Sequence, residues 1–296
     1  MRCRAAAPRP LRAGAACLTV TACVAAALSL AACASPPAIH RYAGSASLVT
    51  ARFPDVAEAL SASCRRAASY RLQRGAEWFG ADSVAAACAA RDGAIRSLGH
   101  ANRALASYFA ALEALADGKV PKLDAQVDDL ADAVGDAGSF DEQQVSAIDA
   151  LASFAANRAA DGYRRARLRD AIAGQNDNVQ RLTAAMHDIL DRDFARYLAN
   201  DGQAQSIFYR AALTESAARE PLTAILVRDS FDERETELAE RTRAVRALAQ
   251  AMLTVGRGHQ ALYDARDHLG GRQLLATIVA NARELDAAMK RVDKAF

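Results

Sequence analysis

Apolar and small residues recur every three or four positions along most of the chain, the spacing that gives an α-helix one buried face. The clearest examples are two heptad-like runs, one in the first half of the chain and one near its end. The first comprises Ile95, Leu98, Asn102, Leu105, Phe109, Leu112 and Ala116. The second comprises Val245, Leu248, Met252, Val255, His259, Leu262, Arg266 and Leu269. We expect both runs to be the core-facing sides of long helices.

Turn-forming residues divide this pattern into segments. Gly and Pro are scarce, at 16 and 7 of 296 residues, so each is a candidate boundary. The sequence thus predicts helices over 55–73, 82–116, 122–134, 139–172, 179–198, 203–227 with an interruption at Pro221, 245–269 and 275–292. Because the connections are short, neighbouring helices should be antiparallel. The predicted fold is all-α: an elongated antiparallel helical bundle of about six to eight helices, with no sheet.

The first 32 residues differ in composition from the rest of the chain. They hold four arginines in a basic start and no Asp or Glu, and residues 14–32 form an uncharged run rich in Ala, Leu and Val. This order is typical of a secretory signal peptide. Without these residues the formal net charge changes from +2 to −2.

The apolar run closes on Leu30-Ala31-Ala32-Cys33, which resembles the lipobox of bacterial lipoproteins. The resemblance implies cleavage before Cys33 and a diacylglycerol on its thiol, which would anchor the protein in a membrane. It also implies, with Ala34 after the anchor, a place on the outer membrane facing the periplasm. Two alternatives stay open: cleavage by the ordinary signal peptidase after Ala34, and retention of the run as a membrane helix. Nucleic acid is not expected as a partner in this compartment.

The predicted organisation has three parts. Residues 1–32 are the signal peptide, residues 33–54 are the lipidated Cys with a flexible tether, and residues 55–296 are a single all-helical domain. The length and apolar content of the third part suffice for a sizeable core.

Cysteine usage predicts one disulfide. Three of the six Cys lie in the signal and Cys33 carries the lipid, which leaves Cys64 and Cys88 in an oxidising compartment, where two thiols usually pair. Each lies twelve residues from Ala76, so antiparallel helices that turn there would bring the two level. Two buried free thiols are the alternative.

Two charged clusters are candidate binding surfaces. One is an acidic ridge made of Asp124, Asp128, Asp132 and Asp136, and the other is a basic segment made of Arg164, Arg165, Arg167 and Arg169. The ridge could collect cations, although it lacks the glycine of an EF-hand loop. The arginines could bind anionic headgroups or an acidic protein partner. The alternative for each is a solvated helix face with compensating charges nearby.

Motifs for catalysis or metal binding are absent from the sequence. It contains no His-Glu-x-x-His, no Gly-x-Ser-x-Gly, no phosphate-binding glycine loop and no Glu-x-x-His. His259 falls in an apolar run, where a hydrogen-bonded core histidine is the expected identity. His187 with Asp191, and Asp264 with His268, share helix faces and could each begin a metal site. We nevertheless expect no catalytic residue, metal or cofactor.

These observations favour a non-catalytic, lipid-anchored cell-envelope protein. Its helical domain would act as a scaffold or bind a protein partner in the envelope, for example as a protective partner of a toxin. The alternative is a periplasmic carrier that shelters a lipid or another hydrophobic ligand between its helices. A helical metalloenzyme is a third and less favoured hypothesis for the function.

Overall fold

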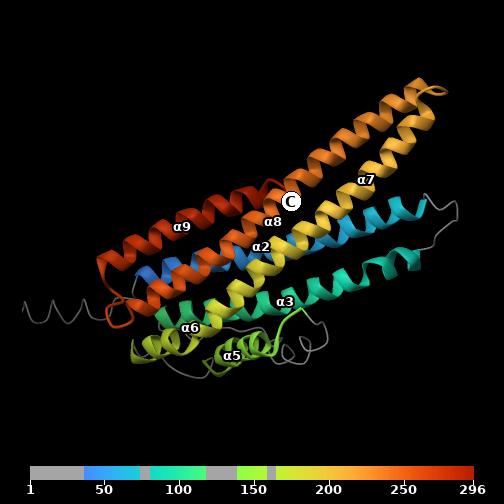
Figure 1. Ribbon diagram of the computed structural model, residues 1–296. Helices are drawn as coiled ribbons and strands as arrows, with labels where there is room; N and C mark the ends of the chain where they lie inside the picture. The colour runs from blue at the N-terminus through green and yellow to red at the C-terminus, as the bar shows by residue number, and fades with distance from the viewer. Residues whose placement is uncertain (1–36, 74–80, 118–138, 159–164) are drawn as a thin grey trace, which may run out of the picture. The chain divides into compact units, whose positions relative to one another are not determined.

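Two long helices, α2 (Pro37–Gln73) and α3 (Ala81–Asp117), form the most extensive helix pair of the protein. The computed structural model describes residues 37–73, 81–117, 139–158 and 165–296 (Figure 1). Within these ranges every regular element is helical and no strand occurs. The all-α prediction is confirmed.

The remaining helices pack around this pair. They are α5 (Glu142–Arg158), α6 (Arg165–Asp188), the π-helical segment η3 (Ile189–Phe194), α7 (Ala195–Ser216), α8 (Pro221–Asp264) and α9 (Arg272–Asp293). Helix α2 contacts α3, α7, α8 and α9, whereas α5 lies against α3 and α6. Their buried faces share one apolar cluster, and the described residues belong to one compact unit. The described helices therefore make a bundle around a common core.

Helix α2 begins eighteen residues earlier than the sequence predicted. The expected flexible tether over 33–54 is wrong from Pro37 onward, because residues 37–54 are helical and bury Ile39, Tyr42 and Val49. Residues 33–36 lie outside the described part of the chain. Pro54 suggested a boundary, but it lies inside the helix with buried neighbours on both sides. Burial of this apolar face offsets the roughly 3 kcal/mol that an internal proline costs.

The chain is also helical at two places where the sequence predicted that helices end. Helix α6 runs straight through residues 174–178, and α6, η3 and α7 continue without interruption past residues 200–202, where a helix end was expected. Asn176 and Asp201, which suggested those boundaries, are both buried and hydrogen-bonded to other helices. Tertiary contacts therefore outweigh their low helix propensity.

The two heptad-like runs were predicted correctly as core-facing. Every residue of the first run is buried, and the second is buried from Val245 to Leu262. Helix α8 then ends at Asp264, short of Arg266, and the turn at Gly270-Gly271 precedes α9 as expected. No helix among the described residues is long and apolar enough to cross a membrane.

Candidate functional site

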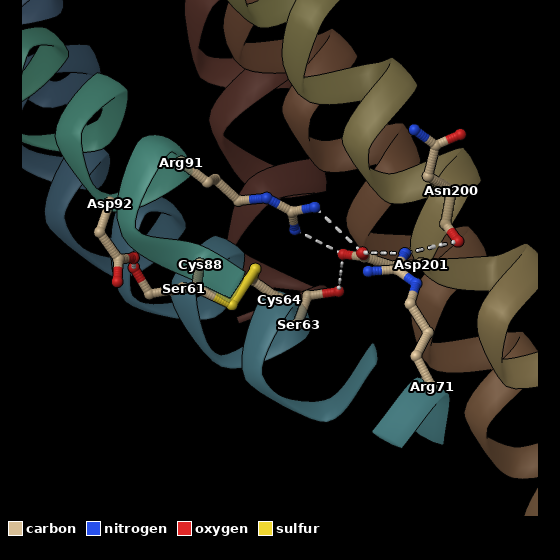
Figure 2. Close-up of polar contacts among 9 residues, drawn as sticks. All are labelled: Ser61, Ser63, Cys64, Arg71, Cys88, Arg91, Asp92, Asn200 and Asp201. Carbon is tan, nitrogen blue, oxygen red and sulfur yellow. Dashed lines mark hydrogen bonds and ion pairs between the residues drawn. A yellow bond between two sulfur atoms is a disulfide. The ribbon is translucent and has the colours of Figure 1, made fainter. Parts of the chain in front are cut away.

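A buried ionic cluster ties three helices together around Asp201 of α7. Arg91 of α3 donates two hydrogen bonds to its carboxylate, at 2.6 Å and 3.0 Å. Ser63 of α2 donates a third, at 2.9 Å. Figure 2 shows these side chains converging between the helices. Because the side chains of Arg91 and Asp201 are only 8% and 3% exposed, the pair is almost completely withdrawn from water.

The Cys64–Cys88 disulfide lies directly beside this cluster (Figure 2). It joins α2 to α3 with the two Cα atoms 5.9 Å apart, as predicted from the spacing of the two cysteines. Cys64 follows Ser63 in the chain, and Cys88 lies about one helical turn before Arg91. The covalent bond therefore fixes the two helices at the point where both contribute to the ionic cluster.

Further contacts surround the pair formed by Arg91 and Asp201. Arg71 approaches to 3.8 Å and donates a hydrogen bond to the backbone oxygen of Asn200. The Arg91 guanidinium lies 4.6 Å from the ring centroid of Tyr197, a cation–π contact. With three hydrogen bonds and a second arginine nearby, the buried Asp201 carboxylate has the charged and polar partners that its burial requires. We therefore regard the cluster as an anchor between helices.

A second buried polar group surrounds His259 of α8. Its Nε2 accepts a hydrogen bond from the Tyr108 hydroxyl at 2.6 Å, and its Nδ1 donates to the Asn176 side chain at 3.0 Å. Burial lowers the pKa of His259 to about 3, so the ring is neutral at physiological pH. Burial likewise raises the pKa of Tyr108. The expectation of a hydrogen-bonded core histidine is confirmed.

An open hollow lies where the end of α2 meets α7. Its volume is about 520 Å³, and its lining comprises Tyr70, Arg71, Asn200, Gln203, Ala204 and Ile207. The Tyr70 ring stacks on Phe208 with 4.8 Å between the centroids. The lining mixes polar and apolar side chains, so the hollow suits an amphipathic ligand better than a purely apolar one.

The first turns of α8 expose an apolar face made of Leu222, Ile225 and Leu226. These side chains are 78%, 56% and 68% exposed, and they lie on one side of the helix because their spacing is three and four. No residue between 206 and 243 is fully buried, so this end of the α7–α8 hairpin contributes little to the core. Figure 1 shows α7 and the first half of α8 running together away from α5 and α6. We call these three residues the α8 face.

The charged clusters predicted from the sequence do not form the sites found here. The whole acidic ridge and Arg164 lie outside the described residues, as does Cys33, the predicted site of lipid attachment. Arg165 opens α6, and Arg167 is half-buried. Arg169 forms an exposed ion pair with Asp267 at 3.1 Å. For Arg169 the structure agrees with a solvated helix face whose charges are compensated.

Sequence reasoning missed the ionic cluster, although the pattern contained a signal for it. Its three main residues each occupy a core-facing position between apolar or small neighbours. Ser63 lies between Leu60 and Ala67, Arg91 between Cys88 and Ile95, and Asp201 between Leu198 and Ala204. A charged residue at such a position must find a partner, because an unpaired buried charge is costly. An Arg and an Asp on two such runs therefore predict one another.

The described residues contain no group of three or more His, Cys, Asp and Glu side chains that could hold a metal ion. His187 instead lies 3.1 Å from the backbone oxygen of Ala249, and Asp264 accepts a hydrogen bond from Gln260.

Comparison with known proteins found no match: no protein-family model, no curated protein and no solved structure matches the chain.

Proposed function

We propose that this chain is a non-catalytic, lipid-anchored envelope protein that binds another protein through the α8 face. The observation that carries the proposal is the clustering of Leu222, Ile225 and Leu226, each more than half exposed, within five residues. A cluster of large apolar side chains in water is typical of an interaction surface. The rest of the bundle supports this surface: the ionic cluster and the disulfide hold α2, α3 and α7 together.

The membrane part of the proposal rests on the resemblance of residues 30–33 to a lipobox. A lipid on Cys33 would hold the protein at the outer membrane, with the domain facing the periplasm. Mass spectrometry of the intact protein tests this directly, because a processed chain must begin with a diacylated Cys33. A C33S variant that is still cleaved and still fractionates with membranes would contradict the assignment.

Site-specific photo-cross-linking in cells tests the protein-binding part. A photoreactive residue in place of Ile225 should give an adduct with a protein of defined mass, and the adduct should disappear when Leu222 and Leu226 are changed to Ser. The same probe at Glu58, an exposed position on α2, serves as the control. The proposal is wrong if position 225 gives no adduct, or if its adducts match those from position 58.

The second candidate function is the carrier, and the hollow beside Tyr70 is the observation that favours it. Its volume of about 520 Å³ lies within the usual range for small-molecule sites. A carrier should release a stoichiometric small molecule when the purified protein is extracted with organic solvent. Extracts of equal composition from the wild type and from an A204W variant, in which the hollow is filled, would count against this function.

A further inference from the structure

The α8 face continues into an acidic surface on the same side of the helix. Asp229, Asp232 and Glu233 follow Leu222, Ile225 and Leu226 by seven residues each. Seven residues are close to two helical turns, so each carboxylate lies on the same side of α8 as its apolar counterpart, about 10 Å further along. The two sets together make one continuous stripe, apolar first and acidic second.

The three carboxylates are exposed. Within the described part of the chain, none of them takes part in an ion pair or accepts a side-chain hydrogen bond. Two other acidic residues of α8 behave differently, since Glu237 pairs with Arg234 and Glu240 with Lys294. The stripe therefore presents three negative charges that pair with no described residue, beside the exposed apolar side chains of the α8 face.

We infer that the stripe binds a basic amphipathic helix of a partner protein, with apolar side chains over the α8 face and Lys or Arg over the carboxylates. This inference rests on the proposed protein-binding function and specifies its partner. Packing of one amphipathic helix on another is a common recognition mode in which residues three and four apart act as anchors. The complementary charges would set the register and orientation of the partner helix.

The same charges argue against two other occupants. An anionic membrane surface repels three carboxylates, so it is a poor match for this side of α8. A second copy paired in parallel would place the carboxylates against one another. An antiparallel copy centred on the α8 face would place its carboxylates opposite residues 215–219, before α8 begins at Pro221, so they would not pack on that helix.

Binding of designed peptides to the purified full chain tests the inference. The probe is a fluorescent, helical 18-residue peptide with Leu at three positions and Lys seven residues after each Leu. A matched peptide carries Glu in place of Lys. The Lys peptide should bind about tenfold more tightly than the Glu peptide at low salt, since three exposed pairs each contribute modestly. This difference should shrink at about 1 M salt, where screening is nearly complete.

Charge-reversed variants show whether the stripe is responsible. The variant D229K/D232K/E233K should invert the preference and bind the Glu peptide more tightly. The control E58K/D170K/E235K makes the same change in net charge at exposed carboxylates away from the stripe, and it should keep the wild-type preference. Circular dichroism of both variants checks that the helices remain folded.

Three outcomes would overturn the inference. The first is equal affinity for the two peptides, and the second is loss of the preference in the control variant as well. The third is wild-type binding to phosphatidylglycerol vesicles that depends on the α8 face and exceeds binding to the Lys peptide. If cross-linking from position 225 still captures a protein in any of these cases, the proposed function stands and only the partner chemistry is wrong.

Discussion

Replacing Asp201 with Ala should be among the most destabilising single changes in this protein. The change removes three hydrogen bonds from Arg91 and Ser63 and leaves the Arg91 guanidinium, 8% exposed, without its counter-charge. Breaking a buried ion pair by removing one partner typically costs about 3–5 kcal/mol, and we expect about 4 kcal/mol here. With a urea m-value of about 3 kcal/mol/M, the unfolding midpoint should fall by about 1.3 M.

Urea denaturation followed by circular dichroism measures this loss, and the chain offers a matched control. Asp267 pairs with Arg169 at the surface, where both side chains are more than half exposed. D267A should therefore cost under about 1 kcal/mol. The double variant R91M/D201L, which removes both charges, should recover most of the stability lost by D201A. If D201A and D267A lower the midpoint equally, the cluster around Asp201 does not anchor the three helices.

Three further predictions concern the interior of the bundle. Reducing the Cys64–Cys88 disulfide, which closes a loop of 24 residues, should lower the free energy of unfolding by about 3 kcal/mol in matched urea titrations; a change under about 1 kcal/mol would contradict its role. His259 stays neutral in the folded protein down to about pH 3, whereas an unfolded His takes up a proton near pH 6.5. Stability should therefore fall by about 2–3 kcal/mol between pH 6.5 and pH 4.5, and an H259Q variant with an equally steep fall would refute this cause. A Cβ at Gly258 would lie 2.7 Å from a tyrosine ring carbon of α2, so G258A should destabilise the protein. A Cβ at Gly174 would have nothing within 4 Å, so G174A should stabilise the helix by about 0.5–1 kcal/mol. Thermal melts that rank the two variants the other way would contradict this packing.

The sequence predicted the fold well where burial follows the heptad spacing. The runs around Leu105 and Met252 are buried as expected, and the level placement of Cys64 and Cys88 followed from the helix rise. These features depend on local periodicity, which one sequence records directly.

The predictions failed where a residue of low helix propensity makes a tertiary contact. Asn176 bonds to Gln260 across to α8, and a Cβ at Gly202 would lie only 2.8 Å from Leu238. Asn176 lies inside a helix because its side chain bonds to a neighbouring helix, and Gly202 because a neighbouring side chain packs closely against it. Local rules interpret the same residues as turns, since a single sequence does not show which distant residue they meet.

The ionic cluster also depends on a contact between distant residues, which the sequence does not show. Arg91 and Asp201 are separated by 110 positions, and each alone resembles an irregularity in an apolar run. Only the fold shows that both irregularities face each other beside the disulfide. The α8 face was missed for a different reason. Apolar residues at helical spacing predict burial, and only the structure shows that Leu222, Ile225 and Leu226 are exposed among the described residues.

The position of α2 in the bundle has a consequence for the order in which the chain can fold. The Tyr42 hydroxyl donates a hydrogen bond to the backbone oxygen of Val255, and Arg52 pairs with Asp293 of α9. The first described helix therefore obtains some of its neighbours only after nearly the whole chain has been synthesised. Until then its apolar side, including Ile39 and Val49, has to be shielded in another way, which makes incomplete chains natural substrates for chaperones. Translation that stops before α9 should leave a product that aggregates or is degraded, even though six of the seven described α-helices would already be present.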